Sequence, residues 1–231
     1  MRRTTIYAVW MLIIYLLLSP AMPVIAGPAE ESTVQSAISV MNEAMEIPED
    51  AIPTNLLNNA YGIAIFPELV KAGFIVGGRY GNGVLLLKQE NQTWSNPVFF
   101  RLTGGSIGWQ IGAQLSDVIL VFMNKRSLDS IASGQFTLGA NASLAAGPVG
   151  RNAEASTDVM LRAEILSYSR TRGLFAGVSL EGAAVQVDYG ATSAFYNVPG
   201  ILPVEVFRNS FIAAPRVSAE LKNLLAQYCR M

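Results

Sequence analysis

The fold of the chain is limited most by its middle stretch, residues 62–189, where apolar residues often recur at every second position and glycines are frequent. Within residues 106–115 and again within 183–189, apolar and other residues alternate strictly. This period of two is typical of a β-strand with one face on the core and the other in solvent. Residues 118–123 are apolar throughout, which predicts a central strand buried on both faces. We therefore expect antiparallel strands joined mostly by short connections.

Glycines within the predicted strands indicate a strongly curved sheet, because residues without a Cβ permit coiling and close backbone approach. They are Gly73, Gly77, Gly108, Gly112, Gly139, Gly177 and Gly182. The sequence Gly81-Asn82-Gly83 lies between two apolar runs and predicts a tight hairpin turn. We expect an α+β fold, in which a strongly curved, barrel-like antiparallel β-sheet has flanking N-terminal and C-terminal helices. Alternation alone does not decide whether the strands close into a barrel.

Helices are predicted on either side of this stretch and once within it. Ser32 and Gln35 form a capping box ahead of apolar residues at helical spacing, which predicts the first helix. The expected helices cover residues 32–46, 53–60, 125–132 and 218–228. No long linker divides residues 27–231, so we expect them to form a single domain.

The first 26 residues have the pattern of a secretory signal peptide. Arg2 and Arg3 precede an unbroken apolar run over residues 6–18, and small residues follow as far as Ala26. A run of 13 residues is shorter than the roughly 20 that a helix needs to span a bilayer, so we expect cleavage after Ala26. The predicted location is periplasmic or secreted, peripheral to a membrane. The alternative is an inner-membrane anchor formed by an uncleaved signal.

The composition excludes several classes of function. The chain has no histidine and one cysteine, Cys229, so it lacks Ser-His-Asp catalysis, Cys/His zinc sites and internal disulfides. Cys229 is interpreted as an incidental tail thiol, the alternatives being a reactive thiol or an intermolecular disulfide. Loss of residues 1–26 leaves 14 basic against 17 acidic residues, a net charge of −3, whereas a nucleic-acid binder needs a concentrated basic face. We expect no nucleic-acid partner, no cofactor and no bound metal.

A possible nucleophile motif lacks the structural context that catalysis requires. Residues 104–108 match the G-x-S-x-G pattern, but a predicted strand follows where a nucleophile elbow requires a helix. The chain also has no histidine to accept the serine proton. We interpret the segment as a turn into a strand, and we expect no enzyme activity and no catalytic residues.

Two polar turns carry arginines that suit phosphate groups. Residues 147–151 form a glycine-bracketed turn that ends in Arg151, and residues 167–173 carry Arg170 and Arg172. Guanidinium groups and exposed turn N–H groups bind phosphate oxygens. These three arginines are therefore the candidate lipid-headgroup ligands, provided that the two turns lie at the same end of the sheet. The alternative is that they pair with carboxylates such as Glu164, or with Glu154 or Asp158, or are simply solvated.

Six segments, in the same order, resemble the SYLF domain family over roughly residues 50–196. They are residues 60–67 (AYGIAIFP), 71–83 (KAGFIVGGRYGNG), 94–99 (WSNPVF), 103–112 (TGGSIGWQIG), 147–151 (GPVGR) and 168–182 (YSRTRGLFAGVSLEG). The resemblance implies a non-enzymatic lipid-binding domain. Eukaryotic members bind phosphoinositide-containing membranes and some bind actin, whereas bacterial members are typically small exported proteins.

The chain departs from the eukaryotic members at its N-terminal helix. Where they have a basic amphipathic segment, the helix predicted here carries Glu43 and Glu46 and neither Lys nor Arg. A periplasm also lacks actin, so actin is not expected as a partner there. The leading hypothesis is an exported bacterial protein that associates with anionic phospholipid membranes.

Two other functions are left open by the sequence. One is a structural or protein-interaction component of the cell envelope, in which Met41 and Met45 serve an envelope protein partner. The other is a carrier that encloses a lipid tail within the curved sheet.

Overall fold

The computed structural model describes residues 27–132, 135–150, 163–171, 174–177, 180–209 and 212–229. The predicted signal peptide, Arg151 and Arg172 lie outside these residues. The described helices are α2 (Pro28–Glu46), α3 (Thr54–Asn59), α4 (Lys125–Ala132), α6 (Tyr189–Tyr196), α7 (Pro203–Arg208) and α8 (Arg216–Tyr228). The described strands are β1 (Gly62–Leu87), β2 (Val98–Phe122), β3 (Gln135–Thr137), β4 (Leu144–Ala146), β5 (Ile165–Thr171), β6 (Leu174–Gly177) and β7 (Ala184–Val187).

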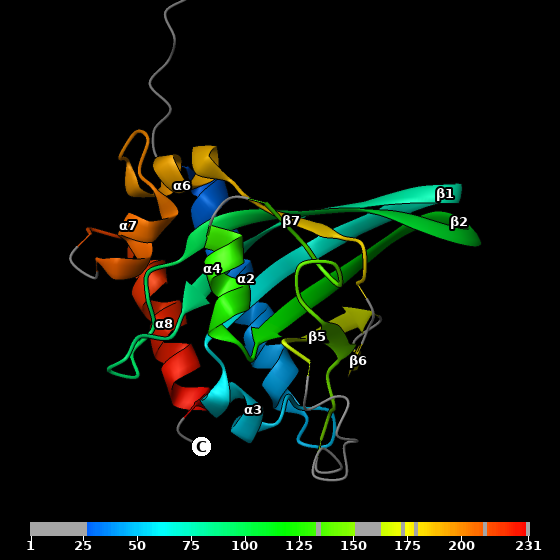
Figure 1. The fold of residues 1–231 in the computed structure, drawn as a ribbon, viewed down its shortest axis with the longest axis horizontal. Helices are drawn as coiled ribbons and strands as arrows, with labels where there is room; N and C mark the ends of the chain where they lie inside the picture. The colour runs from blue at the N-terminus through cyan, green and yellow to red at the C-terminus, as the bar shows by residue number, and fades with distance from the viewer. Residues whose placement is uncertain are drawn as a thin grey trace, which may run out of the picture.

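Strands β1 and β2 form one long antiparallel ribbon that doubles back on itself. The pairing runs from Gly62 opposite Phe122 to Leu85 opposite Val98. Its register shifts twice, between Phe66 and Leu69 and between Gly73 and Ile75. Figure 1 shows the ribbon leaving the body of the molecule and returning to it, so that its far end projects on the side away from α7 and α8. We call residues 69–80 and 103–116 the distal ribbon.

The two arms of β1 touch at glycines. A Cβ added to Gly83 would lie 2.3 Å from the carbonyl oxygen of Ile65, and one added to Gly81 would lie 3.1 Å from the Cα of Leu69. The predicted hairpin turn at Gly81-Asn82-Gly83 is therefore wrong. These residues continue the strand, opposite residues 100–102, and the glycines serve the close approach of the arms.

The sheet is antiparallel and strongly curled, as predicted, with one parallel pair. Among the described residues it has seven strands, in the order β3-β7-β2-β5-β4, with β1 also on β2 and β6 also on β5. The parallel pair is β4 and β5. Residues 118–122 lie between β1 and β5, and all five have an exposed fraction of 0%. The predicted central strand is thus confirmed.

The predicted flanking helices are also confirmed, but α2 begins at Pro28 after the N-cap Gly27, so the predicted Ser32 cap is wrong. Helix α2 packs on β1 and α8, and it buries one stripe at helical spacing. That stripe is Val34, Ala37, Val40, Met41 and Ala44. Met41 is fully buried and Met45 packs against the core, so this face of α2 serves the fold and is not open to a protein partner.

Further local predictions were wrong. Residues 104–108 do not form a turn, because they lie within β2 and pair with β1. Helices α6 and α7 replace a predicted strand end and an irregular stretch. The strand predicted as far as Tyr189 ends at Val187, because the Asp188 carboxylate accepts a hydrogen bond from the Ala191 N–H at 3.0 Å and starts α6.

Candidate functional site

Arg170, the one predicted headgroup ligand within the described residues, lies near the end of β5 in a set of ion pairs. Its Nη2 and Nε atoms lie 2.8 and 3.1 Å from the Asp117 Oδ2 of β2. It also pairs with Glu43 of α2. Its side chain is 25% exposed. Arg170 thus connects a helix and two strands, and it uses acidic partners other than the three considered from sequence.

Glu164, one of those three acids, has a different role. Its carboxylate accepts a hydrogen bond from the Ser127 hydroxyl at 2.6 Å, which connects the chain before β5 to α4. Asp117 in turn accepts the backbone N–H of Glu68 at 3.0 Å, besides pairing with Arg170. The acids near β5 therefore hold elements of the fold together.

The described chain leads toward Arg151 and Arg172 from neighbouring strands. Because β4 and β5 are parallel, the chain leaves both at the same end of the sheet. After β4, the Gly150 N–H donates to the Ala51 carbonyl at 2.9 Å. At the end of β5, the Thr171 hydroxyl accepts a hydrogen bond from Gln114 of the distal ribbon at 3.3 Å. Arg151 and Arg172 themselves lie outside the described residues, so their place at one end of the sheet stays a prediction.

The distal ribbon exposes large apolar side chains that sequence reasoning did not single out. Val70 and Leu115 are cross-strand partners, so they lie on the same face of the ribbon. They are 41% and 60% exposed, and Tyr80 on the returning arm is 49% exposed. Leu115 has the largest exposed fraction of the large apolar side chains in the described residues. Alternation had placed Leu115 on a core-facing row, so its exposure could not be predicted from the sequence.

Charge is distributed unevenly between this ribbon and the rest of the chain. None of the 17 acidic residues falls within residues 69–89 or 98–116. The same segments hold Lys71 and Arg79 in the distal ribbon, and Lys88 and Arg101 outside it. Lys71 is exposed, and Arg101 pairs with Asp188 at 2.7 Å. A mildly acidic protein therefore carries a basic ribbon with exposed apolar side chains.

We call Val70, Lys71, Tyr80 and Leu115 the ribbon surface.

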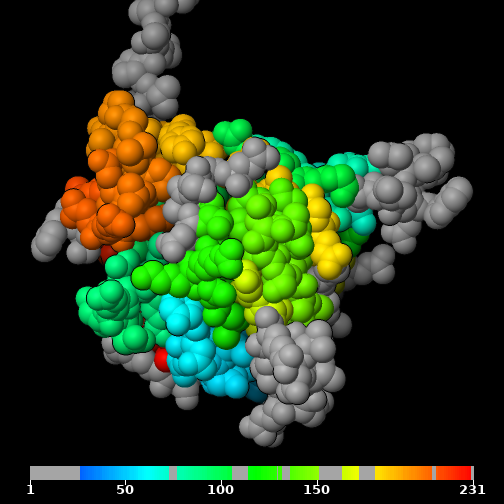
Figure 2. All heavy atoms as spheres, viewed as in Figure 1, coloured from blue at the N-terminus to red at the C-terminus, as the bar shows by residue number. Residues whose placement is uncertain are grey.

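A second group of exposed apolar side chains lies on α6, on α7 and between them, at Tyr189, Val198, Leu202 and Val204. In the space-filling view (Figure 2) the α6–α7 region and the ribbon lie on opposite sides of the molecule. The second group thus provides a reference surface of similar exposure.

Cys229 has the environment of a structural thiol. It is partly buried after α8 and its Sγ donates to the Leu57 carbonyl at 3.4 Å. Burial raises the pKa of the thiol, and this outweighs the lowering effects of the Lys88 charge and the Trp94 indole. The thiol is therefore protonated at neutral pH, which argues against a reactive thiolate.

Metal-ion and membrane-spanning features were also sought. Within the described part of the chain, no three Cys, Asp or Glu side chains gather as ligands for a metal ion. No helix of those same residues is both long and apolar enough to cross a bilayer.

In the described residues, the candidate site is thus an exposed surface with apolar and basic side chains on a curled sheet. The chain belongs to the family whose model is described as Las17-binding protein actin regulator (Ysc84), which matches residues 103–228, more than half of the chain. The resemblance to the SYLF family is thereby confirmed.

Known relatives come from fungi and animals. An SH3 domain-containing protein of Schizosaccharomyces pombe is 37% identical over 180 residues, which cover 77% of this chain and 41% of the relative. The SH3 domain-containing YSC84-like protein 1 of Homo sapiens is 35% identical over 161 residues, 67% of this chain and 47% of the relative. The LAS seventeen-binding protein 3 of Saccharomyces cerevisiae is 37% identical over 151 residues, which cover 64% of this chain and 33% of the relative. The chain spans about half the length of these relatives, or less, and the name of the Saccharomyces cerevisiae relative describes a binding protein.

Proposed function

We propose that this protein is a non-enzymatic lipid-binding protein that associates peripherally with anionic phospholipid membranes. The observation that carries the proposal is the ribbon surface. There the paired Val70 and Leu115 are exposed on one face of a projecting ribbon without acidic residues, and Lys71, the next residue along β1, is exposed on the other face. A thin ribbon with exposed apolar side chains and a lysine matches the two layers of an anionic membrane interface, apolar chains below and negative headgroups above.

The expected energetics suit reversible binding. Transfer of apolar area from water gains about 25 cal/mol per Å², so partial insertion of two aliphatic side chains gains about 2 kcal/mol. A basic residue near an anionic surface adds about 1 kcal/mol. Tyr80 has an apolar ring with a polar hydroxyl, which is the type of side chain enriched at headgroup depth. Each contribution is small, so binding is expected to be reversible. Salt screens the attraction between the basic residues and the anionic headgroups, so binding is expected to weaken as salt is added.

Arg151, Arg170 and Arg172 belong to the same proposal as headgroup ligands. Thr171, between the last two, is hydrogen-bonded to Gln114 of the distal ribbon, which supports a common membrane-facing region. Arg170 already pairs with Asp117 and Glu43, so we assign it a smaller share of headgroup binding than Arg151 and Arg172.

The proposed location follows from the sequence pattern of residues 1–26. We propose that these residues are a secretory signal, and that the protein acts in a periplasm or outside the cell at a membrane surface. An uncleaved signal would instead anchor the chain in the inner membrane. Mass determination of the N-terminus of the protein isolated from its natural host separates these two cases.

Protein binding is the second candidate function. The names of the relatives refer to Las17 binding and actin regulation, and the exposed apolar group at Tyr189, Val198, Leu202 and Val204 could contact a protein. Such a protein would retain a specific partner through the α6–α7 region and would not bind vesicles.

Vesicle co-sedimentation tests the leading function. The chain from Gly27 onward is used, because it contains every described element and lacks the apolar run of residues 6–18. Phosphatidylcholine vesicles with and without phosphatidylglycerol are compared at low and high salt. We expect binding to the anionic vesicles that weakens as salt is added.

Two paired variants locate the contact. Val70→Ser with Leu115→Ser removes the apolar pair, and Val198→Ser with Leu202→Ser removes side chains of similar exposure from the reference surface. The first variant is expected to weaken vesicle binding about tenfold, the equivalent of about 1.4 kcal/mol, and the second to leave it unchanged. Equal loss in both variants, or no binding to any vesicle, would contradict the proposal.

The arginines are tested separately from the ribbon surface. Arg151→Ala with Arg172→Ala is expected to remove much of the preference for anionic over neutral vesicles. Arg170→Ala leaves Asp117 and Glu43 without this cation, so its vesicle binding is compared only after its stability has been measured. An unchanged lipid preference in the double variant would remove the arginine turns from the proposal.

A further inference from the structure

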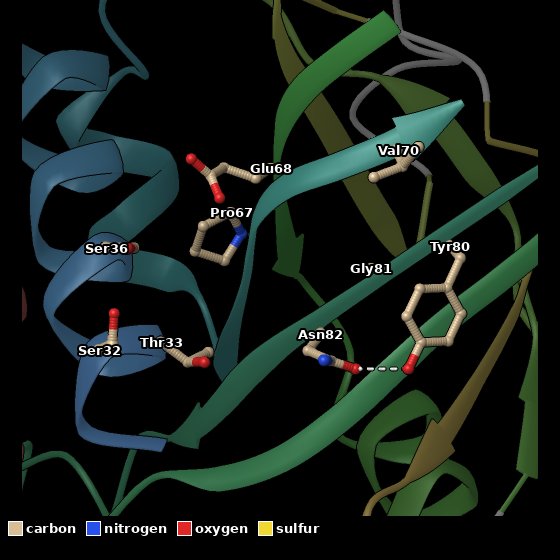
Figure 3. A pocket seen from close by; sticks show the side chains of 9 residues that line it. All are labelled: Ser32, Thr33, Ser36, Pro67, Glu68, Val70, Tyr80, Gly81 and Asn82. Carbon is tan, nitrogen blue, oxygen red and sulfur yellow. Dashed lines mark hydrogen bonds between the residues drawn. The ribbon is translucent and has the colours of Figure 1, made fainter. Parts of the chain in front are cut away.

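A polar cavity of about 280 Å³ lies where helix α2 faces strand β1 beside the ribbon surface. Figure 3 shows Ser32 and Ser36 on the helix side and Glu68, Tyr80 and Asn82 on the strand side of this hollow. Val70 also lines it. The cavity therefore opens beside two members of the ribbon surface, Val70 and Tyr80.

The lining of the cavity is rich in hydrogen-bond acceptors. Glu68 is the one charged side chain among the residues that line it, and it takes part in none of the ion pairs found in the described residues. The Tyr80 hydroxyl donates its proton to Asn82 Oδ1 at 3.1 Å, and Thr33 donates its own to the Ala29 carbonyl at 3.0 Å. Both oxygens are left as acceptors toward a ligand.

Glu68 owes its position to a β-bulge. It lies in the register shift between Phe66 and Leu69, and its φ of 51° is in the left-handed region. Its N–H donates to Asp117 instead of to the strand ladder. A non-glycine residue in this conformation costs about 1 kcal/mol, and a bulge redirects a side chain out of the regular alternation. In Figure 3 the Glu68 side chain extends toward the space between β1 and α2.

This chemistry selects the charge of a ligand. A phosphate or sulfate would meet the Glu68 carboxylate with no cation in the lining to offset it. A primary ammonium has three N–H donors and no acceptor, so it matches a hollow lined by one carboxylate and several hydroxyl oxygens. The half-exposed Tyr80 ring adds an aromatic face to which a cation is attracted. A quaternary ammonium has no N–H to donate and would leave these acceptors unused.

We propose that this cavity binds a primary ammonium group, as in a phosphoethanolamine headgroup, while the apolar part of the same lipid lies along Val70 and Leu115. The proposal rests on the proposed function, because Val70 and Tyr80 belong to both the cavity and the ribbon surface. It adds a headgroup preference that the basic ribbon alone does not provide.

Vesicles of matched charge test the preference. Two sets contain the same fraction of phosphatidylglycerol, and the remaining lipid is phosphatidylethanolamine in one set and phosphatidylcholine in the other. We expect about twofold to fivefold tighter binding to the ethanolamine vesicles, the range of an exposed ion pair. Glu68→Gln and, separately, Ser32→Ala with Ser36→Ala should abolish this difference, whereas Glu220→Gln, an exposed acid on α8, should keep it.

The outcomes separate this proposal from the proposed function. Equal binding to both vesicle sets, or a preference that survives in the Glu68→Gln and the serine variants, overturns the ammonium site and leaves membrane binding intact. Failure to bind any vesicle overturns the proposed function instead, and glycerophosphoethanolamine then tests the cavity by NMR. Shifts of the cavity residues by this soluble compound but not by glycerophosphocholine support an ammonium site for a free ligand. Absence of such shifts in that case overturns the site.

Discussion

The two ends of the β1–β2 ribbon have the same kind of pairing but opposite surroundings. At the base, residues 63–66 pair with residues 118–121 and all are at most 2% exposed. In the distal ribbon, Val70 and Leu115 are paired in the same ladder and are 41% and 60% exposed. Pairing therefore does not decide burial. The difference comes from what lies against each end.

The base is covered on several sides. Helix α2 packs on β1, β5 pairs with β2, and the returning arm of β1 lies against Ile65 through Gly83. The distal ribbon lacks β5 as a neighbour, because the pairing of β5 with β2 begins at Asp117. The apolar residues of the base therefore stabilise the fold, whereas those of the distal ribbon are available for binding.

The largest effect is expected at Phe66, which is fully buried at the base. Phe66→Ala removes a buried ring and leaves a cavity, which costs about 3–5 kcal/mol of unfolding free energy. Val70→Ala, four residues further along the same strand, is expected to cost less than about 1 kcal/mol. Urea unfolding followed by circular dichroism measures both. Similar losses for the two variants would show that the distal ribbon belongs to the core.

Two glycines give a second test of the same division. Gly83→Ala places a methyl group 2.3 Å from the Ile65 carbonyl oxygen and 2.5 Å from the Phe66 ring, so the arms must separate at a cost of about 1–3 kcal/mol. Gly105→Ala in the distal ribbon meets nothing within 4 Å, and we expect it to be neutral or slightly stabilising. The same unfolding assay compares them. A tolerated Gly83→Ala would mean that the arms are not held in contact.

The glycines also show where sequence reasoning stops. Alternation predicted the strands, a continuous apolar run predicted the central position of residues 118–122, and the glycines predicted the curvature, because period and composition are local properties. Gly81-Asn82-Gly83 was interpreted as a turn for the same local reason, whereas its glycines serve a contact with residues about 18 positions earlier, at Ile65. Such a contact between distant residues cannot be predicted from the local sequence.

The candidate site was predictable only in part. Residue types were enough to select the arginine-bearing turns as candidates. They could not predict the pairing of Arg170 with Asp117, which lies 53 residues earlier. Leu115 continued a row of apolar residues that indicated a core face, and its exposure depends on which strands end before the distal ribbon. The bulge at Glu68 likewise follows from a register shift that the sequence does not show.

A smaller effect, dependent on pH, is expected at Asp188, where the returning part of the ribbon meets α6. Burial tends to raise the pKa of its carboxyl, but hydrogen bonds from Arg101 and from the Ala191 N–H outweigh this and hold the pKa below its ordinary value. A carboxyl with a lowered folded-state pKa stabilises the fold above its unfolded pKa of about 4, and this contribution is lost as pH falls through the folded value. Asp188→Asn keeps a helix cap and removes the charge, so we expect a loss of about 1 kcal/mol at pH 7.

Unfolding of both proteins as a function of pH measures this contribution. The difference between wild type and Asp188→Asn should shrink as the pH falls below about 4. A difference that stays constant from pH 7 to pH 3 would show that the Asp188 charge does not contribute, and that Arg101 is held by other contacts.

The smallest effect on stability is expected at Leu115, and it is the most informative for function. Its side chain is 60% exposed, so Leu115→Ser removes little buried area and should change the unfolding free energy by no more than about 0.5 kcal/mol. The same substitution removes apolar area that the ribbon surface would insert into a membrane, so vesicle binding should weaken several-fold while the urea midpoint stays in place. A variant that loses stability and vesicle binding together would indicate that Leu115 supports the shape of the ribbon. Weaker vesicle binding with an unchanged unfolding free energy would assign the distal ribbon to binding, because substitution of a core residue would also lower the unfolding free energy.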